Sequence, residues 1–396
     1  MSTLKVDALK SANGNSFILD VAQKNLIDNG DMSIAQRGTS NSGLTTGNIV
    51  HTMDRWQTYF VPNIGEWTQS QSTDAPDSAG TTATRFNHSL KMECTAGDTT
   101  LNSTEILAIR QGIEGNKLDR LWYGTTNPKS ATLSFWVKSN KTGTYNVVFI
   151  NESYGRKYVG RYTIDAADTW EKKSITIPGD TENGFGTNTI PGNILSNRLR
   201  LYFVLAVGTA RQNTTLEEGV WQTSSGFEYG TGHTVNLADA VGNTWYMTGV
   251  QFEVGENTTE FQYETFQDNF MRCCRYYQRI SRDDTPATSP VYTQGVYIGW
   301  GQFFSSTQAI IQWPLIVPFQ YSPSVTYSDA THLSILENGA LTEPSTAIAL
   351  YNDSLHTSEY HVRVPYLLLT TAAAVNARVG RAFINDSAGW IALGSE

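Results

Sequence analysis

The chain has 396 residues, 16% of them charged, and carries a formal net charge of -9 with a sequence pI of ≈ 5.2. This acidic balance argues against nucleic acid as a partner, because phosphate binding relies on clustered Lys and Arg. The length predicts two or three domains, and the 33 glycines, 19 tyrosines and 10 tryptophans favour an all-β protein with many turns.

Neither a membrane segment nor a disulfide framework is predicted. No stretch approaches the roughly 20 apolar residues of a membrane helix. The three cysteines include the adjacent pair Cys273 and Cys274, which cannot form an ordinary framework of disulfides. No apolar run follows Lys5 and Lys10, so we expect no signal peptide and synthesis in a reducing cytoplasm.

Residues 1–24 are predicted to form an extended leader. Its apolar residues are sparse, and the turn signal Asn13-Gly14-Asn15 interrupts them. Such a segment cannot bury enough surface to fold alone. We expect it to dock on another protein, the alternative being a frayed terminus. The docking candidates are Leu4, Val6, Leu9 and Phe17.

Residues 25–262 show strand signals at short intervals. Leu133, Phe135 and Val137 alternate with polar residues and Trp136, which is the period of a half-buried strand. Residues 197–207 are apolar on both faces, which predicts a central strand covered on both sides. Several such strands predict an antiparallel two-sheet β-sandwich of jelly-roll type, and sandwiches of this kind resemble carbohydrate-binding modules.

Residues 244–282 join this region to the next. Tyr246, Val250 and Phe252 are predicted on one face of a strand, with Gln251 and Glu253 on the other. Residues 263–282 then predict an amphipathic helix with Thr265 as its N-cap and Asp268 reaching back to it.

The apolar stripe of this predicted helix comprises Phe266, Phe270, Cys273, Tyr277 and Ile280. It packs on the sandwich of the same chain or, alternatively, lines an axis shared by three copies, because its four-three spacing is that of a coiled-coil seam.

Residues 283–396 are predicted to form a C-terminal antiparallel β domain. Runs such as residues 309–319 and 361–371 read as strands, and their spacing predicts a second small sandwich. Residues 382–393 are expected to close the chain as a hairpin whose turn is Asp386–Gly389.

Four motifs in this order resemble those of phage tail-fibre and other virion proteins of the marine-phage type. They are NLIDNGDMSIAQRGTS at 25–40, MDRW at 53–56, TGVQFEVG at 248–255 and RCCRYYQ at 272–278. The sequence departs from the family pattern at Phe252, where Leu is usual, and at Cys274, where Gln is usual.

The resemblance implies a virion fibre protein, made in the host cytoplasm and acting in attachment to a host surface polysaccharide. It further implies a homotrimer whose leader docks on other virion proteins. Two alternatives remain open, namely a knob or head-decoration protein without receptor binding, and a polysaccharide depolymerase.

A depolymerase would need two carboxylates flanking a sugar groove. Glu253 with Glu264 and Asp165 with Asp168 are the pairs considered, and all four have the context of ordinary strand or turn carboxylates. No nucleophile elbow, zinc-protease motif or phosphate-binding loop is present. We therefore expect a protein that is not an enzyme.

Sugar recognition uses flat aromatic faces beside short polar side chains, because the C–H face of a pyranose stacks while its hydroxyls need hydrogen bonds. Aromatic residues in polar, glycine-containing contexts are the candidates, the alternative for each being a sandwich edge or a seam between subunits. They are Trp67, Trp122, Tyr123, Trp221, Tyr229 and Trp390.

Arg37 and Asp54 belong to two of the motifs and lie in turn-like contexts. We predict that they form an ion pair of structural role. No cofactor is expected, although Asp28, Asp31 and Asp54 are close enough in sequence to consider a structural Ca²⁺ site.

Overall fold

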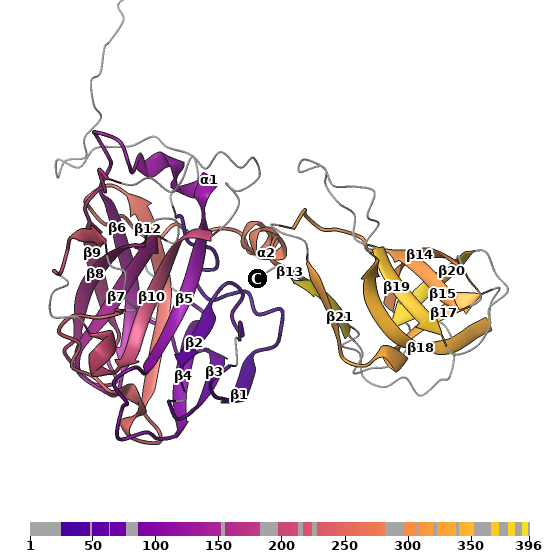
Figure 1. Ribbon diagram of the computed structural model, residues 1–396, viewed down its shortest axis with the longest axis horizontal. Coiled ribbons are helices and arrows are strands. Elements are labelled where there is room, and N and C mark those ends of the chain that lie inside the picture. The colour runs from indigo at the N-terminus through magenta and orange to yellow at the C-terminus, as the bar shows by residue number, and fades with distance from the viewer. Residues whose placement is uncertain are drawn as a thin grey trace, which may run out of the picture.

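The computed structural model describes residues 25–394 apart from 48–49, 63, 77–85, 152–154, 183–196, 213–216, 224–227, 282–295, 304, 306, 320–322, 338–339, 352–365, 372–378 and 385–389. Two β-rich units lie side by side in Figure 1, with helix α2 (Phe266–Cys274) between them. The predicted leader, residues 1–24 with Leu4, Val6, Leu9 and Phe17, lies outside the described residues.

The first unit is a sandwich of two six-stranded antiparallel sheets, as predicted. Sheet 1 has the order β1 (Ser40–Leu44), β3 (Glu66–Ser72), β4 (Ser89–Ala96), β12 (Thr244–Val254), β6 (Ala131–Ser139) and β9 (Glu171–Ile177). Sheet 2 has the order β11 (Trp221–Thr223), β8 (Arg156–Ile164), β7 (Gly143–Asn151), β10 (Asn197–Val207), β5 (Ile106–Glu114) and β2 (Gln57–Val61). Short helical turns connect some of these strands: α1 (Gly115–Leu118), η1 (Asp119–Leu121), η3 (Thr209–Arg211) and η4 (Leu237–Asp239).

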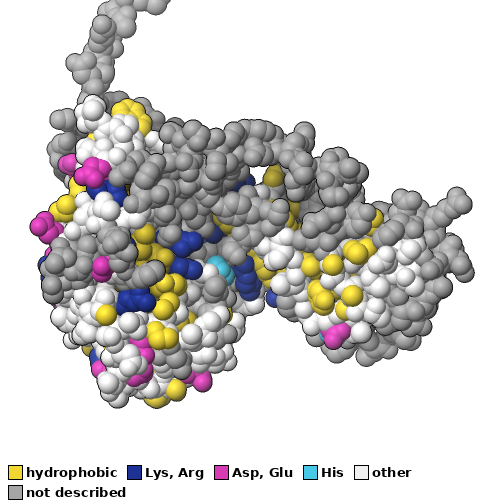
Figure 2. Space-filling model, in the orientation of Figure 1, with side chains coloured by type: hydrophobic (Ala, Val, Ile, Leu, Met, Phe, Trp, Pro, Cys, Tyr) yellow, Lys and Arg dark blue, Asp and Glu magenta, His cyan; other side chains and the backbone are white. Residues whose placement is uncertain are grey.

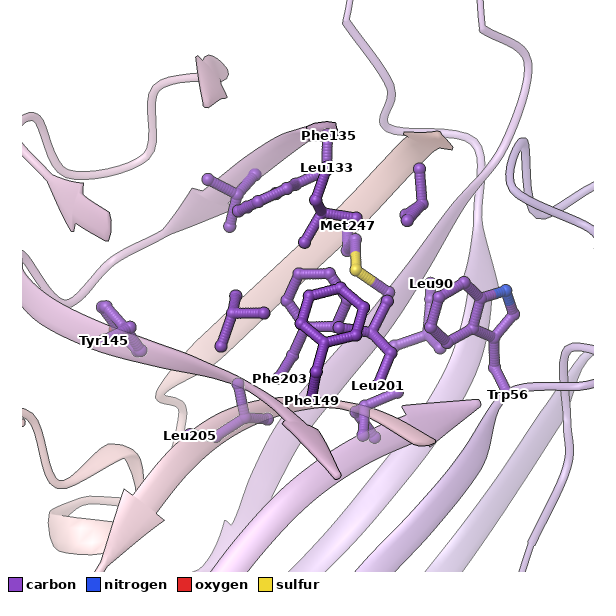
Figure 3. Packing of buried hydrophobic residues seen from close by; sticks show 14 of the residues in the cluster. Trp56, Leu90, Leu133, Phe135, Tyr145, Phe149, Leu201, Phe203, Leu205 and Met247 are labelled. Carbon is purple, nitrogen blue, oxygen red and sulfur yellow. The ribbon is translucent and has the colours of Figure 1, made fainter. Parts of the chain in front are cut away.

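The core of the sandwich lies between the inner faces of the two sheets. Phe135 from β6 and Phe203 from β10 meet edge to face, with ring centroids 5.0 Å apart, and Figure 3 shows them among aliphatic residues from both sheets. Leu133 and Val137 point inward with Phe135, as their alternation predicts. The strand β10 is central, and its outer face is covered as well, since Tyr202 and Val204 belong to a second buried cluster.

The strand β12 departs from the predicted alternation. Trp245 and Met247 point into the core before a register shift between Thr248 and Gln251, and Val250 and Phe252 point into it afterwards. A bulge adds one residue and so exchanges the two faces of a strand. The prediction that Tyr246 shares the face of Val250 and Phe252 is therefore wrong: Tyr246 lies on the outer face.

The bulge depends on Gly249, whose φ is +61°. A Cβ atom at this position would lie 2.6 Å from the ring of Phe86, so the backbone approaches that ring as only glycine permits.

The predicted helix at 263–282 is much shorter in the structure. Helix α2 spans Phe266–Cys274, and Thr265 accepts a hydrogen bond from the backbone of Asp268, as expected of its N-cap. The chain then enters β13 (Tyr277–Ser281). Strand pairing with the C-terminal unit prevails there over the helical spacing of the apolar residues, so Tyr277 and Ile280 do not belong to the helix.

The C-terminal unit is antiparallel β as predicted, but it is not a second sandwich. It contains a closed barrel in the order β14 (Val296–Phe303), β15 (Gln308–Gln312), β19 (Tyr366–Thr371), β18 (Ala340–Tyr351), β17 (Leu333–Glu337) and β20 (Val379–Ile384). A three-stranded sheet joins β13, β21 (Trp390–Gly394) and β16 (Ser324–Tyr327), and the turn η5 (Ala330–His332) precedes β17. The predicted final hairpin is wrong, because β20 pairs in the barrel whereas β21 pairs with β13 and β16.

Candidate functional site

Most of the aromatic residues predicted to contact a glycan are buried. Trp67 is fully buried in the sandwich core, where its indole nitrogen donates to the Ile64 carbonyl at 2.6 Å. A ring in that position cannot stack on a sugar. Trp390 opens β21, but its side chain lies outside the part of the chain that the structure describes.

The structure brings Tyr123 and Trp221 together at one edge of the sandwich. Their rings meet edge to face at 5.7 Å, and both donate to the Pro178 carbonyl, Trp221 at 2.8 Å and Tyr123 at 3.3 Å. Both are buried, so they support the edge rather than face solvent.

Trp122, next to them in sequence, is 54% exposed. Its φ of +55° is uncommon for a bulky residue, and the Lys129 ammonium lies 4.1 Å from its ring centroid. Trp122 is thus the one aromatic of the predicted set, among those whose side chains are described, that offers a ring to solvent.

A broader aromatic surface, which sequence reasoning missed, lies on the outer face of sheet 1. The register places Tyr246 of β12 between Lys138 of β6 and Lys91 of β4. Trp136 is the next outward residue along β6, and Trp170 immediately precedes β9. Trp136, Trp170 and Tyr246 are all half-buried, so part of each side chain remains accessible. We call Lys91, Trp136, Lys138, Trp170 and Tyr246 the Tyr246 face.

The side chains of the Tyr246 face hold one another in place. The Trp170 and Tyr246 rings lie 6.1 Å apart at 68°. The Lys138 ammonium lies 4.4 Å from the Tyr246 centroid and 5.4 Å from that of Trp170. Asp74 at the margin accepts from the Trp170 indole at 3.0 Å and also pairs with Lys138. The Trp170 and Tyr246 rings are therefore held in place by neighbouring side chains.

Two ionisable groups of this surface keep their charge over a wide pH range. Burial raises the pKa of Asp74, but hydrogen bonds from Lys138 and Trp170 outweigh burial and lower that pKa below its ordinary value. Burial lowers the pKa of Lys91, but its hydrogen bond with Glu93, at 2.7 Å, and its further interactions with Glu93 and Tyr246 together outweigh burial and raise that pKa. The surface thus presents rings, ammonium donors and carboxylate acceptors side by side.

The sequence contained part of the signal for this surface. The alternation along β6 already placed Trp136 and Lys138 outward. Tyr246 was assigned to the wrong face because the bulge in β12 is not visible as a change in hydrophobicity, and Trp170 joins only through the pairing of β6 with β9.

The motif residues converge at the start of the C-terminal unit. The Arg55 guanidinium lies 3.3 Å from the Tyr276 ring centroid, and the Arg37 guanidinium lies 3.6 Å from that of Tyr277. Figure 2 shows Lys and Arg side chains gathered around the place where α2 lies in Figure 1. We call this group the junction; it comprises Asp28, Arg37, Asp54, Arg55, Arg272, Tyr276 and Tyr277.

Arg37 and Asp54 lie together as predicted, with Nη1 3.6 Å from Oδ1 and the Asp54 carboxylate buried. Gln36 connects the pair to the next unit, since its side chain contacts Asp54 and donates to the Tyr277 carbonyl at 2.9 Å.

Asp28 is the second buried carboxylate of the junction. Lys117 lies 2.5 Å away, Arg55 3.4 Å and Arg272 3.7 Å. Burial raises the pKa of Asp28, but these cations outweigh burial and lower it to about 2.

The three carboxylates considered for a Ca²⁺ site, Asp28, Asp31 and Asp54, each contact protein side chains. Asp28 and Asp54 face basic side chains, while Asp31 accepts from Ser33 and from Asn269, each at 3.0 Å. Within the described ranges, no group of three or more His, Cys, Asp or Glu side chains could hold a metal ion.

Three of the four carboxylates considered for a depolymerase are engaged with other groups. Glu253 is buried and accepts from the Thr259 backbone at 2.9 Å and hydroxyl at 2.7 Å, whereas Glu264 pairs with Arg272. Asp165 pairs with Lys173 at 3.0 Å.

The predicted apolar stripe is divided in the structure. Phe266 is 66% exposed and stacks on Phe270 at 5.9 Å, whereas Cys273 and Tyr277 are buried and Ile280 is half-buried in β13. The five residues therefore do not form one seam. Among the described residues no helix is long and apolar enough to cross a membrane.

Comparison with known proteins gives no family. No family model and no curated protein match the chain. Among solved structures, the enzymatically active domain of bacteriophage CBA120 tailspike protein 4 matches with a TM-score of 0.28 and 12% identity, over 58% of this chain and 21% of that one.

Two carbohydrate-binding modules match at a similar level. The module TmCBM61, solved with β-1,4-galactotriose, has a TM-score of 0.25 and 9% identity over 55% of this chain and 99% of its own. The family 11 module from Clostridium thermocellum, solved with a β-1,3-1,4-mixed-linked tetrasaccharide, has a TM-score of 0.24 and 12% identity over 56% and 99%. The chain spans about a fifth of the tailspike domain's length and nearly all of each module. At this level of likeness none of the three assigns a ligand to this chain.

Proposed function

We propose that this chain is an attachment protein that binds a cell-surface glycan through the Tyr246 face. The observation that supports the proposal is the grouping of Trp136, Trp170 and Tyr246 on one sheet face, half-buried and beside two ammonium groups. The resemblance of the motifs to those of phage tail-fibre proteins supports the attachment role. On the same ground we propose that the protein is part of a virion.

The chemistry of the Tyr246 face suits a sugar. The C–H face of a pyranose packs on an aromatic ring, and its hydroxyls are both donors and acceptors. Lys91 and Lys138 supply donors, and Asp74 supplies an acceptor at the margin. Because the contacts among these side chains already fix their rotamers, binding costs less conformational entropy than on a mobile surface.

Binding without cleavage is part of the proposal. A single sugar site of this size is weak, and several copies on one particle would raise the overall affinity through avidity. The attachment role is therefore consistent with a shallow surface.

The test uses the intact chain in titrations against a panel of neutral polysaccharides (glucan, galactan and mannan), with reducing ends assayed in the same samples. Tyr246→Ala and Trp170→Ala should each lower affinity for the bound polymer roughly tenfold, because each removes an aromatic contact worth about 1 kcal/mol or more. No reducing ends should appear.

Trp122→Ala is the matched control, because it removes an exposed ring that does not belong to the Tyr246 face. It should leave affinity unchanged. The proposal is wrong if no polymer binds, or if Trp122→Ala abolishes binding while Tyr246→Ala and Trp170→Ala do not. Released reducing ends would instead indicate a depolymerase.

A further inference from the structure

The outer face of sheet 2 carries a second group of aromatic and basic side chains, on the opposite side of the sandwich. The register places Arg110 of β5 between Gln57 of β2 and Tyr202 of β10. Tyr59, two residues along β2, points to the same face, and Tyr229 closes the group from the segment that follows β11. We call Gln57, Tyr59, Arg110, Tyr202 and Tyr229 the Arg110 patch.

The guanidinium of Arg110 is held in place by its neighbours. Nε donates to the Gln57 side-chain oxygen, and Nη1 donates to the Tyr202 hydroxyl at 3.2 Å. The guanidinium carbon lies 4.5 Å from the Tyr59 ring centroid and 5.7 Å from that of Tyr202. These contacts engage Nε and Nη1 and leave Nη2 without a protein acceptor among the residues that the structure describes.

Arg110 differs in this from several other arginines of the sandwich. Arg156 pairs with Asp180 at 2.5 Å and Arg275 with Glu114 at 2.7 Å, and Arg161 pairs with Glu218. In the described part of the chain, no carboxylate pairs with Arg110. A half-buried guanidinium that is fixed but lacks a counter-ion is suited to an oxyanion from outside.

The charges around the patch favour an anion as well. The carboxylates that the structure describes on this face belong to other cations, Glu228 to Lys157 at 3.2 Å and Glu218 to Arg161. Neither of these two carboxylates therefore neutralises Arg110.

The tyrosines complete the polar surroundings. Tyr202 and Tyr229 are only 2% and 6% exposed, and the hydroxyls of Tyr59 and Tyr229 lie 3.2 Å apart. Burial raises the pKa of Tyr229 above its ordinary value, so its hydroxyl stays protonated and can donate a hydrogen bond. The burial of Tyr229 also explains why it cannot serve as the stacking surface predicted from sequence.

We infer that the Arg110 patch binds the oxyanion of an acidic polysaccharide, a carboxylate or a sulfate, with Arg110 as the principal donor. This site is distinct from the Tyr246 face and does not depend on it. The sandwich would then bind an acidic glycan on the outer face of sheet 2 and a neutral glycan on the outer face of sheet 1.

The test measures binding of the intact chain to polygalacturonate, which carries carboxylates, to dextran sulfate, and to uncharged dextran. Wild type should bind at least one charged polymer and bind it more tightly than dextran. Arg110→Gln should lower that affinity roughly tenfold, because charge-assisted hydrogen bonds of this kind are worth about 1.5 kcal/mol or more. Arg110→Lys should lose part of it, since it keeps the charge without the planar fork. The charged polymer that binds identifies the oxyanion.

Arg161→Gln is the matched control, because it removes a basic residue of the same face that already pairs with Glu218. It should leave the affinity unchanged, and all variants should melt at the wild-type temperature. The inference is overturned if neither charged polymer binds, if Arg110→Gln binds as tightly as wild type, or if Arg161→Gln loses as much. Tyr246→Ala should not change binding to the acidic polymer, so this outcome is separable from that of the proposed function.

Discussion

The junction and the Tyr246 face are both built from aromatic rings and cations, yet they differ in what surrounds those groups. At the junction, Arg55 lies over Tyr276, and both Arg55 and its partner Asp28 are almost fully buried. On the Tyr246 face, Lys138 lies over Tyr246 beside Asp74, a carboxylate near solvent.

This difference separates structural residues from candidate binding residues. A buried charge that loses its partner is strongly destabilising, whereas an exposed ion pair contributes little. Residues of three of the motifs that resemble those of virion proteins gather at the junction, where Asp28, Asp54 and Arg55 are buried. The residues that can meet a ligand lie on sheet faces, outside all four motifs.

Replacing Asp28 should give the largest effect on stability. Asp28→Asn leaves Lys117, Arg55 and Arg272 without their buried counter-ion, and we expect a loss of about 3 kcal/mol or more in the free energy of unfolding. Urea unfolding measures this loss. Asp165→Asn, at a carboxylate that faces solvent beside Lys173, is the control and should show no measurable change. Equal stability of Asp28→Asn and wild type would show that the buried ion pairs of the junction stabilise the fold no more than the exposed ion pair of the Tyr246 face.

Acid should weaken the junction in a defined pH window. The pKa of Asp28 is lowered from 3.8 to about 2 in the folded state. The contribution of its ion pairs is therefore present above about pH 4 and is lost as the pH falls through about 2, and it amounts to roughly 2 kcal/mol. Urea unfolding of wild type and Asp28→Asn across this pH window measures the contribution. The difference between their free energies of unfolding should become smaller as the pH falls. A difference that stays constant would contradict the assignment.

Arg37→Ala should have a smaller effect. It removes the ion pair with the buried Asp54 and the contact over Tyr277, and we expect a loss of about 2 kcal/mol. Calorimetry should show a lower melting temperature, while polysaccharide binding by the folded protein should not change. An unchanged melting temperature would show that the pair has no structural role.

Phe266→Ser should have the smallest effect on stability, within about 0.5 kcal/mol, because the side chain is 66% exposed. The Phe266→Ser variant also tests whether Phe266 contributes to the oligomeric state. Sedimentation of wild type and variant should give the same mass if the ring is only a surface residue, whereas a fall from trimer to monomer would assign Phe266 to an interface between copies.

The elements of the sandwich were largely predictable, because the alternation in β6 follows from its inward face and the apolar run of β10 follows from burial on both faces. The helix end was not, since Tyr277 and Ile280 fit a helical stripe and only pairing with β21 places them in a strand. Closure of the C-terminal strands into a barrel likewise depends on the pairing of β14 with β20, which are distant in the chain.

The candidate sites show the same division. Amino-acid order alone was enough for the all-β class, the inward faces of the regular strands, the N-cap Thr265 and the pairing of Arg37 with Asp54, because each depends on local spacing or on charges in adjacent turns. Only the tertiary structure decided which aromatics face solvent. Burial of Trp67 or Tyr229 and exposure of Tyr246 follow from strand order, one bulge and the segments that cross each face, and these are contacts between residues far apart in sequence.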